Sequence, residues 1–438
     1  MKKNFKVIKV IFIIFIFLLS LIGCGKDTSS FIFYLNPGDQ TINSSEKFKA
    51  LSVPGEFIIK RKSSYYRSNN INNIYSMTSN INPSRPSIRL IKRISQLNAE
   101  VISFQSNKED ILKQLQNDPS IEYIEPNYIR RILINDFYSR KNVSMVNDPR
   151  RIEQYALDKL KAEQTWKISS GENVIVAIID TGIDINHPDL KDRIVQGYST
   201  VVGVKSPIDD NGHGTHVAGI IGATSNNKIG IAGIAPLCKL MPIKVLSREG
   251  AGNDASISEG IIWAVDHGAS VINMSLGGPG ESKTLLNAIQ YALKKNVVVV
   301  SAMGNDSQNI KNYPAAYQDV IAVGSSDKND NWSEFSNFGD WICVNAPGSE
   351  ILSTFPTYQV ELNDYGFTKE YAILDGTSQA APYISGVIAL LQNKFKGKIS
   401  YKEVIRKIQD GVDDLGTPGF DPKFGYGRIN PLKVLTTS

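Results

Sequence analysis

The feature that most constrains the fold is an alternation, across the C-terminal part of the chain, between apolar β-branched runs and segments of helical periodicity. Runs such as VIVAIID (174–180) and VVVVSAMGN (297–305) stay apolar over consecutive positions, as strands do when both faces of a sheet are covered. The helical segments are 213–224, 254–268, 282–296 and 377–395. This alternation predicts an α/β fold, a three-layer domain with a mainly parallel sheet, over residues 148–438.

A smaller unit of a different kind precedes this domain. EFIIKRK (56–62) alternates as a strand does, and two later segments, RLIKRI and AEVISFQ, are also strand-like. Residues 107–118 have apolar side chains at helical spacing after a helix start signal. We therefore predict a small α+β domain at residues 52–130, followed by a linker at residues 131–147.

The first 23 residues have the character of an export signal. A basic stretch, MKKNFKVIKV, precedes an apolar block that is too short for a comfortable membrane span. The LIGC motif resembles the lipobox of bacterial lipoproteins, which implies a signal peptide at residues 1–23, a lipid on the sulfur of Cys24 and a polar tether at residues 24–51. An uncleaved anchor, or a plain signal with a chance cysteine, is the alternative. In each case the body of the protein faces the outside of a cytoplasmic membrane.

Composition and charge exclude several classes of protein. Hydrophobic residues make up 42% of the chain and charged residues 21%, so a large core can form. The net charge is +5 over 438 residues and the basic residues are scattered, so we expect no nucleic-acid partner. The three cysteines make no disulfide framework, and we expect Cys238 and Cys343 to be buried in apolar segments.

Four polar residues stand where predicted strands end or helical segments begin. Asp180 ends the VIVAIID run, and Asn305 ends the VVVVSAMGN run. His213 and Ser378 open helical segments in glycine-rich surroundings. Because chemistry in open parallel sheets is found beyond the carboxyl ends of the strands, we expect these four side chains to meet.

Together these residues supply the groups that an activated serine nucleophile needs, namely an acid, an imidazole, a hydroxyl and an amide donor. A serine alcohol barely ionises at neutral pH, so it needs a base to accept its proton. We assign His213 as the general base for Ser378, and Asp180 as the group that orients the imidazole. The Asn305 amide and the backbone N–H of Ser378 would stabilise a developing oxyanion. Each residue alone could be a cap, a turn residue or a buried structural group, and only their joint occurrence favours catalysis. Pro382 is expected in the first turn of its helix, where a missing N–H does little harm.

Five motifs carry a resemblance to a known family. AIIDTGID, NGHGTHVAGI, SLGG, SAMGN and GTSQAAP, in this order, resemble the motifs of the subtilisin-like serine proteases over about residues 148–431. The resemblance implies a serine endopeptidase with a subtilisin-like fold. An α/β-hydrolase esterase is disfavoured, because its nucleophile lies in GxSxG and precedes its acid and histidine. The family usually has methionine after the nucleophile, where this chain has Gln379; this changes packing beneath Ser378 but removes no catalytic group, so we expect activity.

The family binds an extended peptide between two edge segments. The matching residues here, which the resemblance implies to be substrate-binding, are Gly250, Ala251, Gly252, Ser275, Leu276 and Gly277. Strand addition of this kind gives affinity through main-chain hydrogen bonds and selectivity through side-chain pockets. Met303 and Asn312 fall where the family lines its first pocket, and Asp254 falls near the fourth, but no preferred side chain follows. A plain glycine turn is the alternative for both edge segments.

The resemblance also implies a structural calcium ion. The implied ligands are the side chains of Asp148, Asp189 and Asn227 and the carbonyl groups of Ser225, Ile229 and Ile231. Oxygen ligands of these types suit Ca²⁺. The loop has one residue more than the commonest family pattern, and a solvated, Asn-rich turn is the alternative.

The small domain resembles the inhibitory propeptide of secreted subtilases, especially in DPSIEYIEPNYI (118–129). The resemblance implies a ferredoxin-like α+β domain that covers the active site, assists folding and is cut off by the enzyme itself. A large parallel sheet has many non-local contacts and folds slowly, which gives such a domain a physical purpose. We expect the cut between Arg130 and Val146; a permanent accessory domain is the alternative.

The sequence thus predicts an exported serine endopeptidase made as a self-processed zymogen, held at the bacterial cell surface by a lipid on Cys24 or released after processing. Its partners would be protein or peptide substrates, its own propeptide and, through the lipid, the membrane. The alternatives are a leader peptidase dedicated to one modified peptide, and an inactive module that binds extended peptides at the cell surface. The intact set of Asp180, His213 and Ser378 argues against the inactive module.

Overall fold

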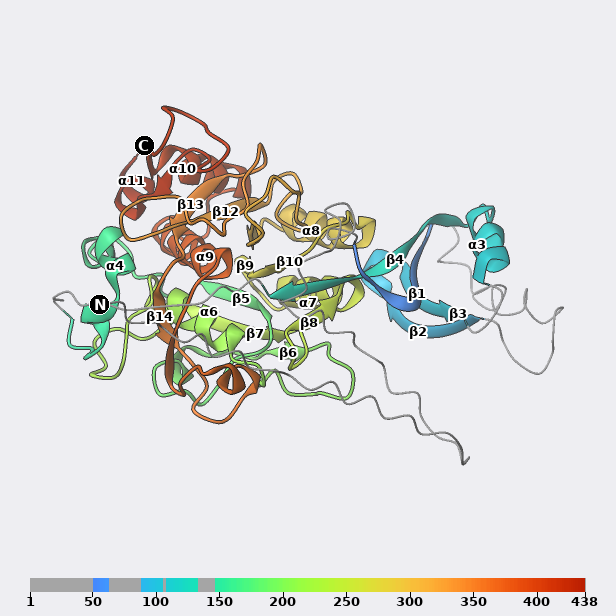
Figure 1. Cartoon of the computed structure of the whole chain (residues 1–438), viewed down its shortest axis with the longest axis horizontal. Helices are drawn as coiled ribbons and strands as arrows, with labels where there is room; N and C mark the ends of the chain where they lie inside the picture. Colours follow the sequence, from blue (N-terminus) through green and yellow to red (C-terminus); the bar gives the residue numbers. More distant parts are fainter. Residues whose placement is uncertain (1–49, 63–87, 105–107, 133–145, 438) are drawn as a thin grey trace, which may run out of the picture. The chain divides into compact units, whose positions relative to one another are not determined.

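A computed structural model describes residues 50–62, 88–104, 108–132 and 146–437 (Figure 1). All of the described residues belong to one compact unit. The expected signal peptide, Cys24, and most of the tether and of the linker lie outside the described residues.

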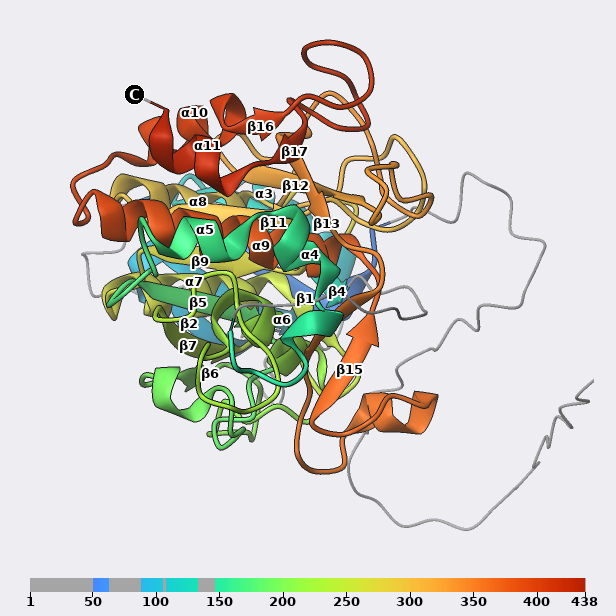
Figure 2. The same cartoon turned by 90° about the vertical axis from the view of Figure 1, so that its left-hand side faces the viewer.

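The large domain is built on a nine-stranded, mainly parallel sheet, as the sequence predicts. Its strands are β5 (Ile175–Asp180), β6 (Tyr198–Ser199), β7 (Lys239–Lys244), β9 (Val271–Met274), β11 (Val298–Ala302), β12 (Ile321–Ser326), β13 (Val344–Pro347), β16 (Val412–Asp413) and β17 (Arg428–Ile429). Their order is β16-β17-β13-β12-β11-β9-β5-β7-β6. In Figure 2 the sheet extends from β16 and β17 at the top to β7 and β6 at the bottom. Only β16 and β17, at one edge, pair antiparallel within the described part of this sheet.

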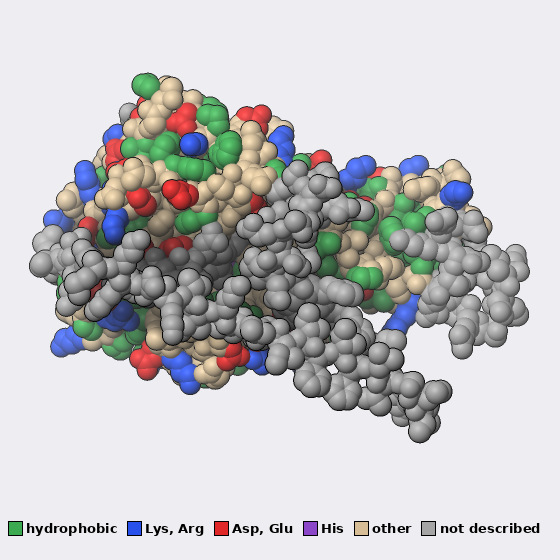
Figure 3. All heavy atoms as spheres, viewed as in Figure 1, with side chains coloured by type: hydrophobic (Ala, Val, Ile, Leu, Met, Phe, Trp, Pro, Cys, Tyr) green, Lys and Arg blue, Asp and Glu red, His purple; other side chains and the backbone are tan. Residues whose placement is uncertain are grey.

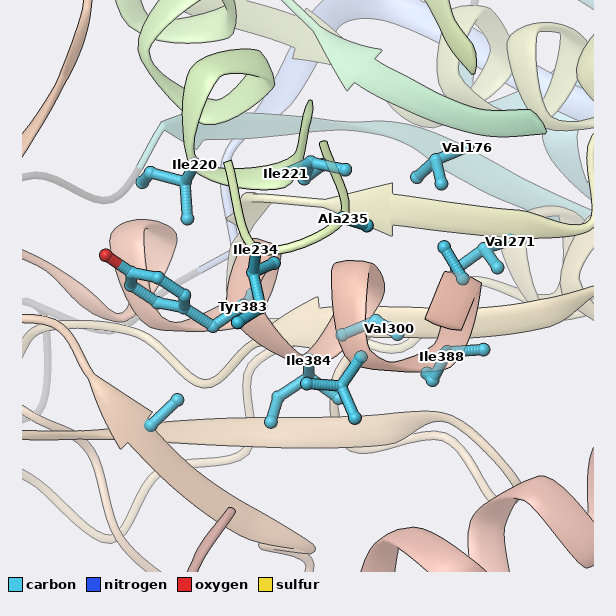
Figure 4. Packing of buried hydrophobic residues seen from close by; sticks show 14 of the residues in the cluster. Val176, Ile220, Ile221, Ile234, Ala235, Val271, Val300, Tyr383, Ile384 and Ile388 are labelled. Carbon is cyan, nitrogen blue, oxygen red and sulfur yellow. The ribbon is translucent and has the colours of Figure 1, made fainter. Parts of the chain in front are cut away.

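Alternate side chains of β5 enter two separate cores, one on each face of the sheet. The four long helices are α6 (His213–Gly222), α7 (Asp254–Asp266), α8 (Lys283–Lys294) and α9 (Thr377–Lys394). Val176 and Ile178 pack with α6 and α9, whereas Ala177 and Ile179 pack with α7 and α8. Figure 4 shows the first of these cores, in which Ile384 of α9 lies near the sheet. Burial on both faces explains why the strand runs are apolar without alternation.

Several elements were not predicted from the sequence. They are the hairpin of β14 (Ile351–Thr354) and β15 (Tyr371–Leu374), the helices α4 (Tyr155–Lys159), α5 (Ala162–Trp166), α10 (Tyr401–Asp410) and α11 (Pro431–Thr436), and 3-10 turns at Ser95–Leu97, Arg151–Glu153, Lys191–Arg193 and Glu361–Tyr365. The apolar run VINMSLGG (271–278) forms two strands. Its first part is β9, and its second part is β10 (Leu276–Gly277), which leaves the large sheet. Ser275 lies between them.

The small domain is an antiparallel sheet with one described helix. Its elements are β1 (Ser52–Arg61), β2 (Ile88–Ile94), β3 (Ala99–Phe104), α3 (Lys108–Gln116) and β4 (Ile121–Ile132), with strand order β4-β1-β3-β2. This order agrees with the expected ferredoxin-like fold. The strand β4 continues past the expected domain end at residue 130, because its last residues pair with β8 (Ala251–Asn253) and β10 of the large domain.

The two faces of the small sheet are buried against different partners. Ile58 and Val101 belong to the core that contains α7 and α8 of the large domain. Ile59 and Ile102 instead pack with Ile111 of α3. One face therefore closes the core of the small domain, and the other face docks that domain on two helices of the large one.

A carboxylate of the small domain caps one of these two helices. The Oγ atom of Ser282 caps α8 by accepting the backbone N–H of Leu285 at 3.2 Å. Glu125 adds to this cap: its oxygens accept the backbone N–H groups of Lys283 and Thr284 at 2.7 and 2.8 Å and the Ser282 hydroxyl at 2.8 Å. The first N–H groups of a helix lack helical partners, and the helix dipole favours a negative charge there. The docking of the two domains is therefore both apolar and electrostatic.

The described surface is of mixed polarity. Figure 3 shows acidic and basic side chains interspersed on one face. Within the described ranges, no helix is both long enough and apolar enough to cross a membrane. Cys238 and Cys343 are buried as expected, and burial raises the pKa of both thiols to about 12.

Candidate active site

Asp180 and His213 meet where β5 ends and α6 begins. Oδ1 of Asp180 lies 2.7 Å from Nδ1 of His213, and both side chains are fully buried. The same oxygen accepts the backbone N–H of Thr181 at 2.7 Å. With Nδ1 donating to the carboxylate, Nε2 is the ring nitrogen that can accept a proton. Nε2 has no hydrogen-bond partner among the described residues.

Ser378 is the second residue of α9 and is fully buried. Its hydroxyl donates to the carbonyl oxygen of Ser275 at 2.9 Å, and not to His213. Hydrogen bonds in an active site often tighten only when substrate is bound, so this orientation does not exclude proton transfer to His213.

The side chain of Ser275 supports the backbone of Ser378. The expectation that Pro382 lies in the first turn of its helix was wrong, since Pro382 is the sixth residue of α9. Proline has no N–H, so the carbonyl group of Ser378, four residues earlier, lacks its helical donor. The Ser275 hydroxyl supplies a donor to that carbonyl at 2.8 Å. Ser275 is thus bound to Ser378 through both its carbonyl and its hydroxyl groups.

The amide of Asn305 is held in one orientation beside the start of α9. Its Oδ1 accepts the backbone N–H of Thr377 at 3.0 Å and the Thr377 hydroxyl at 2.8 Å. Its Nδ2 is buried and has no hydrogen-bond partner within the described chain. The contact leaves the amide NH₂ group, with its two donors, unpaired within the described chain, next to the residue that precedes Ser378. The sequence did not indicate that Thr377 orients the Asn305 amide. This contact forms only because the loop after β11 places Asn305 beside the start of α9.

A second histidine nearby is structural. His216 is fully buried, and its Nε2 donates to the carbonyl oxygens of Ile351 at 3.0 Å and Ala372 at 3.2 Å. Burial, and then the neighbouring His213, lower the pKa of His216 to about 3. His216 therefore stays neutral and ties α6 to the β14–β15 hairpin.

The two edge segments that the sequence identified hold the end of β4 between them. In β8, Ala251 and Gly252 pair with residues of β4, and in β10 Leu276 and Gly277 do so on the other side. The carbonyl oxygen of Gly250 accepts the N–H of Ile132 at 3.1 Å. The pairing is antiparallel strand addition, in which backbone hydrogen bonds bind an extended segment. Ser275, which precedes β10, does not pair with β4; its described hydrogen bonds are with Ser378 and with the Asn273 amide, which donates to the Ser275 hydroxyl at 3.0 Å.

One interdomain side chain that sequence reasoning missed lies in this groove. Arg130 is 0% exposed, and its Nε lies 2.7 Å from Oδ1 of Asp254, which is also 0% exposed. The local sequence does not predict the ion pair between Arg130 and Asp254. The segment IRRIL contains two adjacent arginines, and the register of β4 against β8 and β10 decides which of them is buried.

The three side chains expected to bind calcium, those of Asp148, Asp189 and Asn227, lie together in one loop cluster. The Asn227 amide nitrogen donates to Oδ1 of Asp189 at 2.7 Å, and the Asn227 backbone N–H donates to Oδ1 of Asp148 at 3.0 Å. Ile231 enters the cluster by donating its N–H to Asp189 at 2.9 Å, and Ile229 by donating its N–H to the Asn227 side-chain oxygen at 2.7 Å. Ser225 directly precedes Asn226, whose N–H binds Asp148 at 2.9 Å.

The chemistry of this cluster fits a hard cation. Asp148 and Asp189 are buried; burial raises the pKa of Asp148 and raises that of Asp189 to about 6. The nearby Arg150 and Arg151 form their ion pairs with Glu153, Asp158 and Glu163 instead. No group of three or more His, Cys, Asp or Glu side chains that could hold a metal occurs in the described part of the chain, so a metal here would depend on amide and carbonyl oxygens as well.

Gln379, the residue after Ser378, is a buried amide without partners. Its side chain is fully buried, and neither Oε1 nor Nε2 has a hydrogen-bond partner among the residues described. A buried polar group that is left unpaired costs free energy of folding.

Comparison with known proteins identifies the family. The profile of the subtilase family matches residues 171–427, and the profile of the fervidolysin N-terminal prodomain matches residues 52–127. The first match covers more than half of the chain, which therefore belongs to the subtilase family.

Individual relatives support the same assignment. The thermophilic serine proteinase of Bacillus sp. (strain AK1) is 38% identical over 75% of this chain and 76% of its own length. Thermitase of Thermoactinomyces vulgaris is 40% identical over 66% of this chain and 98% of its own length. The crystal structure of fervidolysin from Fervidobacterium pennivorans, described as a keratinolytic enzyme related to subtilisin, matches 89% of this chain and 61% of its own, with a TM-score of 0.74 and 29% identity.

The chain is a subtilisin-like serine endopeptidase with an N-terminal prodomain, which confirms the family, the fold and the class of enzyme predicted from the motifs.

The unpaired amide of Gln379 generates a prediction about stability. Gln379→Met removes two buried polar atoms at similar volume, so we expect the free energy of unfolding to rise by about 1–3 kcal/mol. Thermal unfolding in a Ser378→Ala background, which avoids self-digestion, measures the effect. Gln290→Met, at an exposed position of α8, is the matched control and should change stability by less than about 0.5 kcal/mol. Equal melting temperatures for the two variants would contradict the prediction.

Proposed function

We propose that this endopeptidase cleaves peptide bonds with Asp180, His213 and Ser378 as its catalytic triad. The observation that carries the proposal is the 2.7 Å contact between Asp180 and Nδ1 of His213, which leaves Nε2 as the free proton acceptor at the edge where Ser378 begins α9. Buried in this way, the carboxylate holds the imidazole in one tautomer and stabilises the imidazolium.

The reaction follows from these positions. As Ser378 Oγ attacks the substrate carbonyl, its proton passes to Nε2 of His213, which then protonates the leaving amine. The free Nδ2 of Asn305 and the backbone N–H of Ser378 donate to the oxyanion that forms. Water then enters, gives its proton to His213 and releases the acyl group. The Ser275 carbonyl, which accepts the Ser378 hydroxyl before reaction, gives it up when the hydroxyl turns to the histidine.

The prodomain acts as an intramolecular inhibitor until the enzyme cuts it off. The pairing of Ile129–Ile132 with both β8 and β10 supports this role, because a substrate that adds as a strand needs the same backbone groups. We place the cut between Arg130 and Val146, most of which lies outside the described residues.

The protein is exported and lipid-anchored before processing. The basic and apolar start of the chain and the LIGC motif support this proposal. A lipid on Cys24 would hold the precursor on the outer face of the cytoplasmic membrane, and removal of the prodomain would leave the catalytic domain without a covalent anchor.

A calcium ion would stabilise the catalytic domain. The side chains of Asp148, Asp189 and Asn227 would hold it together with the carbonyl groups of Ser225, Ile229 and Ile231. Two buried carboxylates in one loop cluster support this proposal, since a divalent cation would offset their repulsion.

The triad predicts which serine reacts. We expect a fluorophosphonate probe to label the wild type but not Ser378→Ala, and we expect Ser378→Ala to accumulate as the unprocessed precursor. Labelling is followed on a gel, and N-terminal sequencing locates the cut. Ser206→Ala, at an exposed serine, is the control and should be labelled and processed normally. Labelling of Ser378→Ala as strong as that of the wild type would end the proposal.

The calcium proposal predicts metal-dependent stability. In the Ser378→Ala background, Ca²⁺ at about 100 times its Kd should add about 2.7 kcal/mol to the free energy of unfolding, and EDTA should remove this gain. Asp189→Asn should lose the response, while Asp192→Asn, at an exposed residue of the same region, should keep it. Thermal unfolding with Ca²⁺, with Mg²⁺ and with EDTA measures the effect. Identical melting curves in all three solutions would refute the proposal that the domain binds a stabilising calcium ion.

The lipid proposal predicts where the precursor is found. With processing blocked by Ser378→Ala, a further Cys24→Ala change should move the precursor from the membrane fraction to the soluble fraction or the medium. Ser29→Ala, five residues later in the tether, is the control and should stay with the membrane. Fractionation and blotting give the readout, and unchanged partitioning of Cys24→Ala would defeat the proposal.

A further inference from the structure

Arg130 is a fully buried charge at the point where the prodomain enters the groove. Its side chain is 0% exposed, although it belongs to the part of β4 that lies between β8 and β10. The next residue, Arg131, is exposed. A charge can be buried in this way only where its partners replace the water that it loses.

Every N–H of the Arg130 guanidinium group has an acceptor. Nε and Nη2 donate to the two carboxylate oxygens of Asp254, at 2.7 and 3.1 Å. Nη1 donates to the carbonyl oxygens of Gly278 and Pro279, both at 2.9 Å, and Nη2 also donates to that of Gly280 at 2.8 Å. A guanidinium group has five donors, and all five are satisfied here. The pocket therefore matches arginine in charge, planarity and donor geometry.

Other side chains would leave groups of this pocket unpaired. Lysine presents its donors at one point and cannot make the two-oxygen contact. An apolar side chain would leave the carboxylate of Asp254 buried without a cation, and burial already raises its pKa to about 6 with Arg130 in place. Sites built around buried polar groups reject ligands that leave those groups unpaired.

The strand register places this pocket relative to the bond that is cut. Ile132, two residues after Arg130, pairs with Leu276 of β10. The next residue of a chain bound in this register would face Ser275, whose carbonyl oxygen accepts the Ser378 hydroxyl. The carbonyl attacked by Ser378 would therefore belong to the third residue after the arginine.

We propose that Asp254, with the carbonyl groups of Gly278, Pro279 and Gly280, makes the mature enzyme selective for substrates with arginine at the fourth position before the scissile bond. The inference rests on the proposed function and adds the class of substrate, which is an extended peptide with one arginine at a fixed distance from the cut. The prodomain fills the pocket in the precursor, and its departure opens the pocket to substrates.

The test compares peptides on the processed wild-type enzyme. The parent is a quenched fluorescent peptide with the sequence of residues 129–136, IRRILIND. Its first arginine is replaced in turn by lysine, leucine and glutamate. A matched control replaces only the second arginine, which corresponds to the exposed Arg131, by leucine. We expect kcat/KM for the parent to exceed that of the leucine and glutamate peptides on the order of 100-fold, and the control to stay within about threefold of the parent.

Asp254→Asn then tests the pocket itself. In this variant we expect the preference for arginine over leucine to fall below about tenfold, through a loss on the arginine peptide. Thermal unfolding checks that Asp254→Asn is folded. If this variant does not fold, the comparison of the arginine and leucine peptides on the wild-type enzyme still decides the proposal. Equal cleavage of the arginine and leucine peptides by the wild type, or an undiminished preference in folded Asp254→Asn, would overturn the pocket and leave the proteolytic function standing. A wild type that the fluorophosphonate probe does not label would instead overturn the function and this inference with it.

Discussion

The burial of the large sheet on both faces is the constraint on which the site depends. Because β11, β9 and β5 are neighbours and run parallel, the residues that follow or end them, Asn305, Ser275 and Asp180, reach the same edge. The helices α6 and α9 cover one face and bring His213 and Ser378 to that edge in their first turns. A slip of one residue in β5 would exchange the side chains of the two cores, so apolar packing fixes the position of Asp180 at the end of the strand.

The same architecture leaves two short strands free to bind an extended chain. The β8 and β10 segments add β4 as a strand, so main-chain hydrogen bonds can serve the inhibitor and a substrate alike. Side-chain contacts distinguish the binding of the prodomain from the binding of a substrate. The Glu125 cap on α8 and the apolar face around Ile58 hold only the prodomain, whereas the contacts of Arg130 lie where any bound chain would pass. Under the proposed function, inhibition and substrate selection would use one groove with two sets of contacts.

The sequence predicted those residues of the candidate site that lie in recognisable local motifs. Asp180, Asn305, His213 and Ser378 each stand at or near an element end that hydrophobic periodicity can locate. Of the six residues expected to line the groove, four pair there with β4, namely Ala251, Gly252, Leu276 and Gly277. Prediction from the sequence failed where a residue's role depends on a distant partner. The two bonds between Ser275 and Ser378 were not foreseen, because one of them depends on Pro382, which leaves a carbonyl group of α9 without its helical donor.

By itself, the sequence determined the α/β layering, the small α+β domain and the candidate catalytic side chains, since these follow from periodicity and motifs within short windows. Tertiary structure alone decided which groups would meet across the chain. Ser275 and Ser378 are 103 residues apart, and Arg130 and Asp254 are 124 apart. The two residues of such a pair meet only after the elements that carry them have packed together. The local sequence around one residue therefore does not predict the identity of its partner.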